Sequence, residues 1–119
     1  MPINKALLSG STAMLLLKLL EEGDKYGYQM MEALAQRSDQ TFQLKAGTLY
    51  PLLHDLEKQG AIRSYEGLAE GKRLRRYYAL TEAGKGLLQE KETEWEQFTR
   101  GVAQVLGHGM KGRDAYDFI

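Results

Sequence analysis

Cysteine is absent from this chain of 119 residues, and other residues with special chemistry are scarce. Without thiols there is no disulfide framework, thiolate metal site or cysteine nucleophile. The two histidines, His54 and His108, stand alone without metal-ligand spacing. The glycines form no phosphate-binding loop after a strand, because Gly67 and Gly71 lie between two predicted strands. We therefore expect no enzyme, no cofactor and no metal ion.

Long hydrophobic runs are also absent. The longest apolar run, residues 13–17, is far shorter than the roughly 20 residues that cross a bilayer, and the amino terminus has no signal-peptide pattern. The absence of cysteine suits a reducing compartment, so we expect a cytoplasmic protein that does not bind a membrane. The length corresponds to one domain with a modest core.

Net charge is the third absence, since 16 Lys and Arg balance 16 Asp and Glu. A neutral total counts against nucleic-acid binding unless the charges are separated along the chain. Residues 44–80 carry seven bases against four acids, whereas residues 81–106 carry three against five. A local basic patch attracts phosphate even when the total is zero, so residues 44–80 are the segment of interest.

Residues 45–60 predict a helix that presents one face to another molecule. Its apolar residues recur with the spacing of one buried stripe: Leu49, Leu52, Leu53 and Leu56. The opposite face carries Gly47, Tyr50, Pro51, His54 and Lys58. Gly47 and Pro51 add little bulk near the amino end, where unpaired N–H groups and the positive end of the helix dipole favour phosphate.

Two helices precede this one. Residues 5–22 are apolar on more than one side, which indicates burial by more than one neighbour, and Gly23 ends that helix. Residues 26–37 form the second helix, followed by a loop over 38–44 in which a short extended piece at 41–44 is one alternative. The second and central helices together predict a helix-turn-helix.

Two strands, 61–66 and 74–80, enclose a hairpin loop over 67–73. Side chains alternate along a strand, so Arg75 and Arg76 point to opposite faces. Four cations cluster here: Lys72, Arg73, Arg75 and Arg76. Such a run is usually only a solvated face, but beside a helix with an anion-favouring end it indicates phosphate contacts. One of the two arginines packing along the sheet is the alternative.

Residues 81–107 predict a long helix with Thr81 as N-cap and Gly107 at its end. Its apolar residues repeat every seven positions as in a coiled coil: Leu88, Trp95 and Val102, and Phe98 and Val105. A domain of this size cannot cover such a helix, so we expect the same helix of a second subunit as its partner. We expect a flexible tail over 108–119.

Trp95 allows two interpretations. It is either plain dimer core or, with its symmetry mate, the wall of a flat slot for a planar aromatic ligand, and both can hold together. We assign Leu8 and Met14 of the first helix to the same interface.

Four blocks of residues together resemble the PadR family of bacterial transcriptional regulators. The blocks are LLKLLEEG (16–23), YGY (26–28), GTLYPLL with LEKQG (47–53 and 56–60), and RRYYALT (75–81). The resemblance extends over about residues 8–86, and the single final helix resembles the family's short-tailed subgroup. Where many members have Gly-Pro or a second glycine before the arginine pair, this chain has Arg73 and Leu74.

The resemblance implies a mainly α fold with a small β-hairpin: a winged helix-turn-helix over residues 1–80, its first helix also at the dimer interface, and a dimerisation helix over 81–107. It also implies a homodimeric repressor that binds an inverted repeat in double-stranded promoter DNA and releases it when a small, often aromatic, compound binds. The implied recognition residues are Lys45, Gly47, Thr48, Tyr50, Pro51 and His54. The implied wing residues are Lys72, Arg73, Arg75 and Arg76, and Tyr28 is the implied backbone contact.

The side chains of the central helix suit this role. Tyr50 and His54 can each donate or accept a hydrogen bond, and Thr48 can also contact a thymine methyl group. The alternative is a winged-helix dimer that binds protein. That alternative predicts an affinity that falls little with salt, because few counterions are released.

Overall fold

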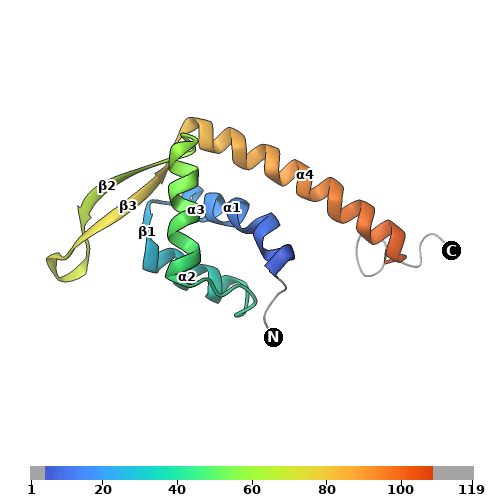
Figure 1. The fold of residues 1–119 in the computed structure, drawn as a ribbon, viewed down its shortest axis with the longest axis horizontal. Coiled ribbons are helices and arrows are strands. Elements are labelled where there is room, and N and C mark those ends of the chain that lie inside the picture. The colour runs from blue at the N-terminus through green and yellow to red at the C-terminus, as the bar shows by residue number, and fades with distance from the viewer. Residues whose placement is uncertain (1–4, 109–119) are drawn as a thin grey trace. The chain divides into compact units, whose positions relative to one another are not determined.

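The computed structural model describes residues 5–108, with side chains described from Ser11 onward. Along the chain the elements are α1 (Lys5–Glu21), β1 (Lys25–Tyr26), α2 (Gly27–Arg37), α3 (Ala46–Lys58), β2 (Ile62–Leu68), a 3-10 turn (Glu70–Lys72), β3 (Leu74–Leu80) and α4 (Glu82–Leu106). Figure 1 shows the β2–β3 hairpin extending away from α1, α2 and α3 as a wing. The predicted winged helix-turn-helix followed by a long helix is confirmed.

The sheet has one strand more than predicted. β1 pairs antiparallel with β3, with Tyr26 opposite Tyr77, so the strand order is β1-β3-β2. Sequence reasoning placed Tyr26 at the start of a helix because a two-residue strand is too short to show alternation. The other candidate for an extended piece, residues 41–44, is not assigned to a strand within the described loop.

β2 runs two residues further than predicted. Gly67 lies opposite Arg75 and Leu68 opposite Leu74, so the hairpin closes through the 3-10 turn rather than through a long loop. The register puts Tyr65 and Tyr77 on one face of the sheet and Ser64 and Tyr78 on the other. The wing therefore has two chemically different faces.

The core lies between the three helices and the base of the sheet. Its buried side chains include Leu16, Leu17 and Leu20 of α1, Met30 and Leu34 of α2, the three leucines Leu49, Leu53 and Leu56 of α3, and Ile62 and Tyr78 of the sheet. α1 contacts both α2 and β3, which confirms that its apolar character on several sides reflects several neighbours.

Thr81 fastens the first turn of α4 to the end of α3. The Thr81 hydroxyl accepts a hydrogen bond from the Gly84 N–H at 3.0 Å and donates one to the Gly60 carbonyl at 2.6 Å. This confirms the predicted N-cap. A Cβ on Gly84 would lie 2.0 Å from the carbonyl oxygen of Ala61, so only glycine allows α4 to start this close to β2.

The chain divides into two compact units after Leu88. The first turns of α4 belong to the first unit, and the rest of α4, from Gln89, belongs to the second. α4 ends at Leu106, followed by Gly107 with a φ of 82°, as predicted. Within α1, the side chain of Leu8 lies outside the described part of the chain, and so does the predicted flexible tail beyond His108.

Candidate nucleic-acid interface

The outer face of α3 is open along its amino-terminal half. Leu49, Leu53 and Leu56 turn the opposite face into the core, as the stripe predicted. Pro51 lies inside the helix and has no N–H, so it donates no hydrogen bond to the carbonyl of Gly47 four residues earlier. A Cβ on Gly47 would meet no atom within 4 Å. This face offers space for another molecule to approach.

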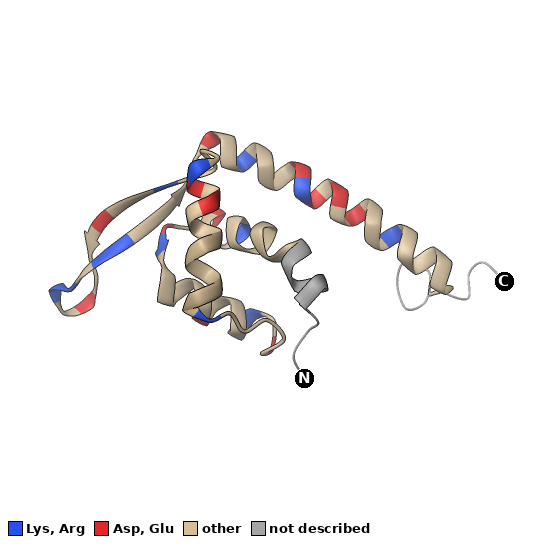
Figure 2. Ribbon diagram, viewed as in Figure 1, with Lys and Arg blue, Asp and Glu red and all other residues tan. Residues whose placement is uncertain are grey.

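Every predicted recognition residue of α2 and α3 is exposed: Tyr28, Lys45, Gly47, Thr48, Tyr50, Pro51 and His54. The first turn of α3 contains no acid, and Lys45 is its N-cap residue. Figure 2 shows the acidic residues of α3 in its carboxy-terminal half. The positive end of the helix dipole is therefore free of nearby negative side chains from its own helix, which favours phosphate.

Tyr50 joins the start of α3 to the start of α2. A Cβ on Gly27 would lie 2.1 Å from the Tyr50 hydroxyl oxygen, so a side chain at residue 27 would displace this phenol. Tyr50 is still 44% exposed, and Tyr28, the residue after Gly27, is 59% exposed. The contact adds a packing role for Tyr50 to the predicted recognition role. Sequence reasoning missed it because periodicity does not show which α3 residue faces α2.

The predicted wing cations lie in the same unit as α3. Lys72 and Arg73 are exposed at and after the turn, where Gly71 and Lys72 both adopt positive φ. Arg75 and Arg76 point to opposite faces of β3, as predicted. Their surroundings differ because only one of these faces lies against α3.

Arg76 is connected to α3 through the hydroxyl of Ser64. Its guanidinium donates to the Ser64 hydroxyl at 2.9 Å, and that hydroxyl donates to a Glu57 carboxylate oxygen at 2.7 Å. Glu57 lies in α3 and is partly buried. Arg76 is therefore linked to α3 through the Ser64 hydroxyl while its own side chain stays exposed. Arg75 is partly buried, so it is the arginine that fits the alternative of packing along the sheet.

Arg75 lies on an aromatic ring instead. Its guanidinium carbon is 5.1 Å from the centroid of the Tyr26 ring, a cation–π geometry. The Arg75 Nε atom is buried and has no hydrogen-bond partner. None of the ion pairs between described side chains includes Arg75. Its charge is thus available to an external anion.

Two tyrosines of the wing are harder to ionise than a free phenol. Burial raises the pKa of Tyr78, and the neighbouring Arg76 charge opposes that shift. The pKa of Tyr65 is raised because its hydroxyl donates a 2.6 Å hydrogen bond to Asp24, which ionisation would break. At neutral pH both phenols remain hydrogen-bond donors.

Sequence reasoning overlooked four residues of this surface: Asp24, Tyr26, Arg63 and Tyr65. Arg63 lies 5.6 Å from the Tyr65 ring centroid, and Tyr65 stacks on Tyr77 at 5.6 Å. Alternation along β2 could have indicated that Arg63 and Tyr65 share a face. Asp24 is 41 residues away from Tyr65, and no local pattern connects them.

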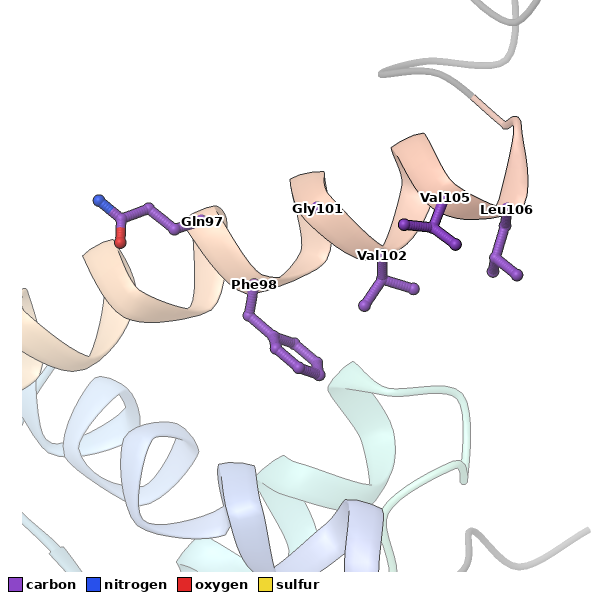
Figure 3. Close-up of a pocket in the computed structure, with 6 residues that line it drawn as sticks. All are labelled: Gln97, Phe98, Gly101, Val102, Val105 and Leu106. Carbon is purple, nitrogen blue, oxygen red and sulfur yellow. The ribbon is translucent and has the colours of Figure 1, made fainter.

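The second unit exposes an apolar stripe on α4. Figure 3 shows Phe98, Val102 and Leu106 pointing to one side of the helix while Gln97 points away. They line an open hollow of about 510 Å³. Phe98 is 60% and Val105 88% exposed, and Trp95 lies 6.1 Å from Phe98 between ring centroids.

The other predicted interface residues lie in the first unit. Leu88 is 2% exposed and belongs to the core of its own chain. Met14 is partly buried and packs against the same core. The stripe that remains exposed is therefore formed by Trp95, Phe98, Val102 and Val105, with Leu106 as an addition that the heptad pattern did not include.

Among the side chains that the structure describes, no group of three His, Asp or Glu is placed to hold a metal ion. Of the helices in residues 5–108, none has the length and apolar character needed to cross a membrane.

Comparison with known proteins identifies the family. Residues 16–90 match the model of the PadR-like family of transcriptional regulators. A transcriptional regulator of Mycobacterium tuberculosis is 39% identical over 67 residues, which are 56% of this chain and 62% of that protein.

Solved structures agree in fold as well as sequence. A PadR family transcriptional regulator from Eggerthella lenta is 36% identical with a TM-score of 0.74, over 85% of this chain and 86% of that one. A transcriptional regulator from Clostridium thermocellum is 33% identical with a TM-score of 0.78, over 86% of this chain and 96% of that one. The family consists of regulators that bind DNA, not of enzymes, and the resemblance seen in the sequence is confirmed. This chain belongs to the PadR-like family of transcriptional regulators.

Proposed function

We propose that this regulator is a homodimeric repressor that leaves promoter DNA when a small aromatic compound binds near its dimer interface. One observation supports this best: the first unit exposes a basic, anion-favouring surface, while the second unit exposes an apolar stripe with no partner in its own unit. The first surface suits DNA and the second suits another copy of the chain. The protein would act in the cytoplasm, where it meets the chromosome.

In the proposed complex, α3 enters the major groove with its amino-terminal half. Thr48, Tyr50 and His54 then reach base edges, and Lys45 meets phosphate. Gly47 and Pro51 allow the DNA to approach α3 closely. Tyr28, at the start of α2, contacts the sugar–phosphate backbone of the DNA. The wing places Lys72, Arg73 and Arg75 at phosphates outside the major groove.

The proposed dimer pairs α4 with α4 of a second copy. Trp95, Phe98, Val102 and Val105 would be covered by their symmetry mates, as in an isologous interface. Two recognition helices about 34 Å apart then match half-sites one turn apart on the same face of DNA, which predicts an inverted repeat. In this division of labour, residues 1–80 bind DNA and residues 81–107 form the dimer.

The effector would bind beside Trp95 and Phe98. A flat aromatic compound fits between large rings and an apolar wall, and the nearby Glu92, Glu94 and Glu96 favour a cation. A ligand releases DNA only if it binds more tightly to a dimer whose recognition helices no longer match the half-site spacing. α4 is continuous from the Thr81 cap to this stripe, so it can transmit such a change.

The test is binding of the purified protein to the DNA upstream of its own gene and to a scrambled duplex of the same composition, each across a series of salt concentrations. We expect preference for the upstream duplex and a steep fall of affinity with salt, with a slope of about −0.9 per phosphate contacted. Equal binding to both duplexes, or binding that ignores salt, would contradict the proposal and favour the protein-binding alternative.

The effector is tested separately by screening planar aromatic compounds, cationic and neutral, for release of the bound upstream duplex. Trp95→Ala should lose the response of the wild type, while Thr93→Ala on the same helix should keep it. If Trp95→Ala still responds fully, Trp95 is plain dimer core. Expression from the upstream promoter in cells with and without the regulator then decides between repression and activation.

A further inference from the structure

We propose that Tyr26 is a positioning residue for DNA binding: its ring holds Arg75 so that the guanidinium meets a DNA phosphate beside the start of α2. This rests on the proposed function. It assigns a role to a residue that is not among the predicted DNA-contacting residues, and it distinguishes Arg75 from its neighbour Arg76.

The two arginines of the wing differ in their partners within the fold. Arg76 donates to Ser64, which donates to Glu57, so one of its hydrogen-bond donors is already engaged within the fold. Arg75 has a ring beneath it and no acid paired with it among the described side chains. Its Nε is buried without a partner, so the free donors are the terminal amino groups of the guanidinium. Stacking on a ring leaves the guanidinium edge, with these donors, open to a phosphate.

Tyr26 is held on several sides, so it is a fixed platform. Its backbone pairs with Tyr77 across the sheet, and its N–H donates to the Gln29 side chain at 3.0 Å. Its ring meets the Tyr77 ring edge to face, with centroids 5.4 Å apart and planes at 85°. Tyr77 in turn stacks on Tyr65, with centroids 5.6 Å apart.

Two further contacts anchor this row of rings. Tyr65 donates its 2.6 Å hydrogen bond to Asp24, two residues before Tyr26, so the row is tied at both ends to the segment that leads into α2. Gly67 provides the space for Tyr77, because a Cβ there would lie 2.9 Å from the Tyr77 ring. A ring fixed in this way restricts Arg75 before DNA arrives, and less side-chain entropy is then lost on binding.

The place to which Arg75 is held also suits an anion. Tyr26 is the N-cap residue of α2, whose first turn contains no acid. The exposed Tyr28 follows on the same turn. A phosphate at this point would meet the Arg75 charge, the positive end of the α2 dipole and a phenol donor together.

The experiment measures affinity for a duplex of random sequence across a salt series, because a phosphate contact does not depend on sequence. The variants are Tyr26→Phe, Tyr26→Leu, Arg75→Gln, Arg76→Gln and the double variant Tyr26→Leu/Arg75→Gln. All variants are first compared with the wild type by circular dichroism and thermal unfolding. If Tyr26→Leu does not fold, Tyr65→Phe takes its place in the double variant. Tyr65→Phe removes the hydrogen bond to Asp24 that anchors the row of rings, and it keeps all three rings.

We expect Arg75→Gln to reduce the magnitude of the salt slope by about 0.9, the value of one phosphate contact, and Arg76→Gln to reduce it less. Tyr26→Leu should weaken binding about threefold, the size of an exposed cation–π interaction, and Tyr26→Phe should bind like the wild type because the ring is kept. In the Arg75→Gln background, Tyr26→Leu should have no further effect. A merely structural role of Tyr26 would weaken binding equally in both backgrounds.

The inference is overturned if Tyr26→Leu reduces DNA affinity by the same factor with and without Arg75. It is also overturned if Arg75→Gln leaves the salt slope unchanged while the wild type binds DNA with a steep slope. Either result would leave the proposed function intact. Absence of salt-dependent binding by the wild type itself would overturn the proposed function as well.

Discussion

α3 and α4 both carry an apolar stripe with helical spacing, but the two stripes have opposite surroundings. In α3, Leu49 and Leu53 are fully buried by α1, α2 and the sheet of the same unit. In the second unit, Phe98 is 60% and Val105 88% exposed. The spacing of apolar residues thus shows that a helix has a face to bury, and the tertiary structure shows whether its own unit buries it. The α3 stripe stabilises the fold, whereas the α4 stripe has burial still to gain.

The largest expected effect comes from breaking the covered stripe. Leu53→Ala should lower the free energy of unfolding by about 3 kcal/mol, because it removes buried methyl groups and leaves a cavity in a close-packed core. Urea unfolding followed by circular dichroism measures this. Leu68→Ala, at the exposed tip of the wing, is the control and should change the same quantity by less than about 0.5 kcal/mol. Equal effects would mean that the α3 stripe does not form the core.

Placing a charge on the bare stripe should break the dimer and spare the fold. Phe98→Glu should weaken self-association by a factor of roughly 30 or more, since burying an unpaired carboxylate costs about 2 kcal/mol or more. Sedimentation equilibrium gives the association constant, and thermal unfolding reports the fold. Gln104→Glu, exposed on the same helix, adds the same charge outside the stripe and should leave association nearly unchanged. A dimer unaffected by Phe98→Glu would locate the subunit contact elsewhere.

Two glycines at the start of α4 test the contact between this helix and the rest of the first unit. Gly84→Ala should lower the free energy of unfolding by about 1–3 kcal/mol, because its Cβ would overlap the Ala61 carbonyl oxygen and displace the start of α4. Gly86→Ala, two residues later with nothing within 4 Å of the new methyl group, should raise it by about 0.5–1 kcal/mol, as expected for a helix interior. In the dimer, Gly84→Ala should weaken binding to the upstream duplex more than to random DNA, because the helix spacing changes. A change of the free energy of unfolding in the same direction for both variants would contradict the close contact between Gly84 and the Ala61 carbonyl.

The smallest effect concerns the buried phenol behind α3. The pKa of Tyr78 is raised by burial above its ordinary value of 10, so above pH 10 the unfolded chain loses this proton more readily than the folded one. The contribution of Tyr78 is therefore fully present below pH 10, and it is lost as the pH rises through the folded-state pKa. Unfolding free energies on both sides of pH 10 should show a smaller alkaline loss in Tyr78→Phe than in the wild type. The same loss in both proteins would assign it to other groups, such as Tyr65.

The wing shows how far local patterns extend. Alternation along β3 correctly placed Arg75 and Arg76 on opposite faces, because side chains in a strand alternate regardless of context. It could not show that one face lies against Glu57 of α3 and the other against Tyr26, since these partners are far apart in sequence. β1 was missed for a related reason: two residues become a strand only because β3 offers an edge to pair with.

The sequence by itself determined the family and the order of the four helices and the two strands of the wing. Four motif blocks and the spacing of leucines in α3 suffice for that, since helix periodicity, capping by Thr81 and the recognition motifs are local properties of neighbouring residues. Only the tertiary structure decided which stripe is covered, which partners each arginine of the wing has and why Gly84 must lack a side chain. Each of these depends on contacts between segments distant in the chain, and distances of that kind are set by packing rather than by local preference.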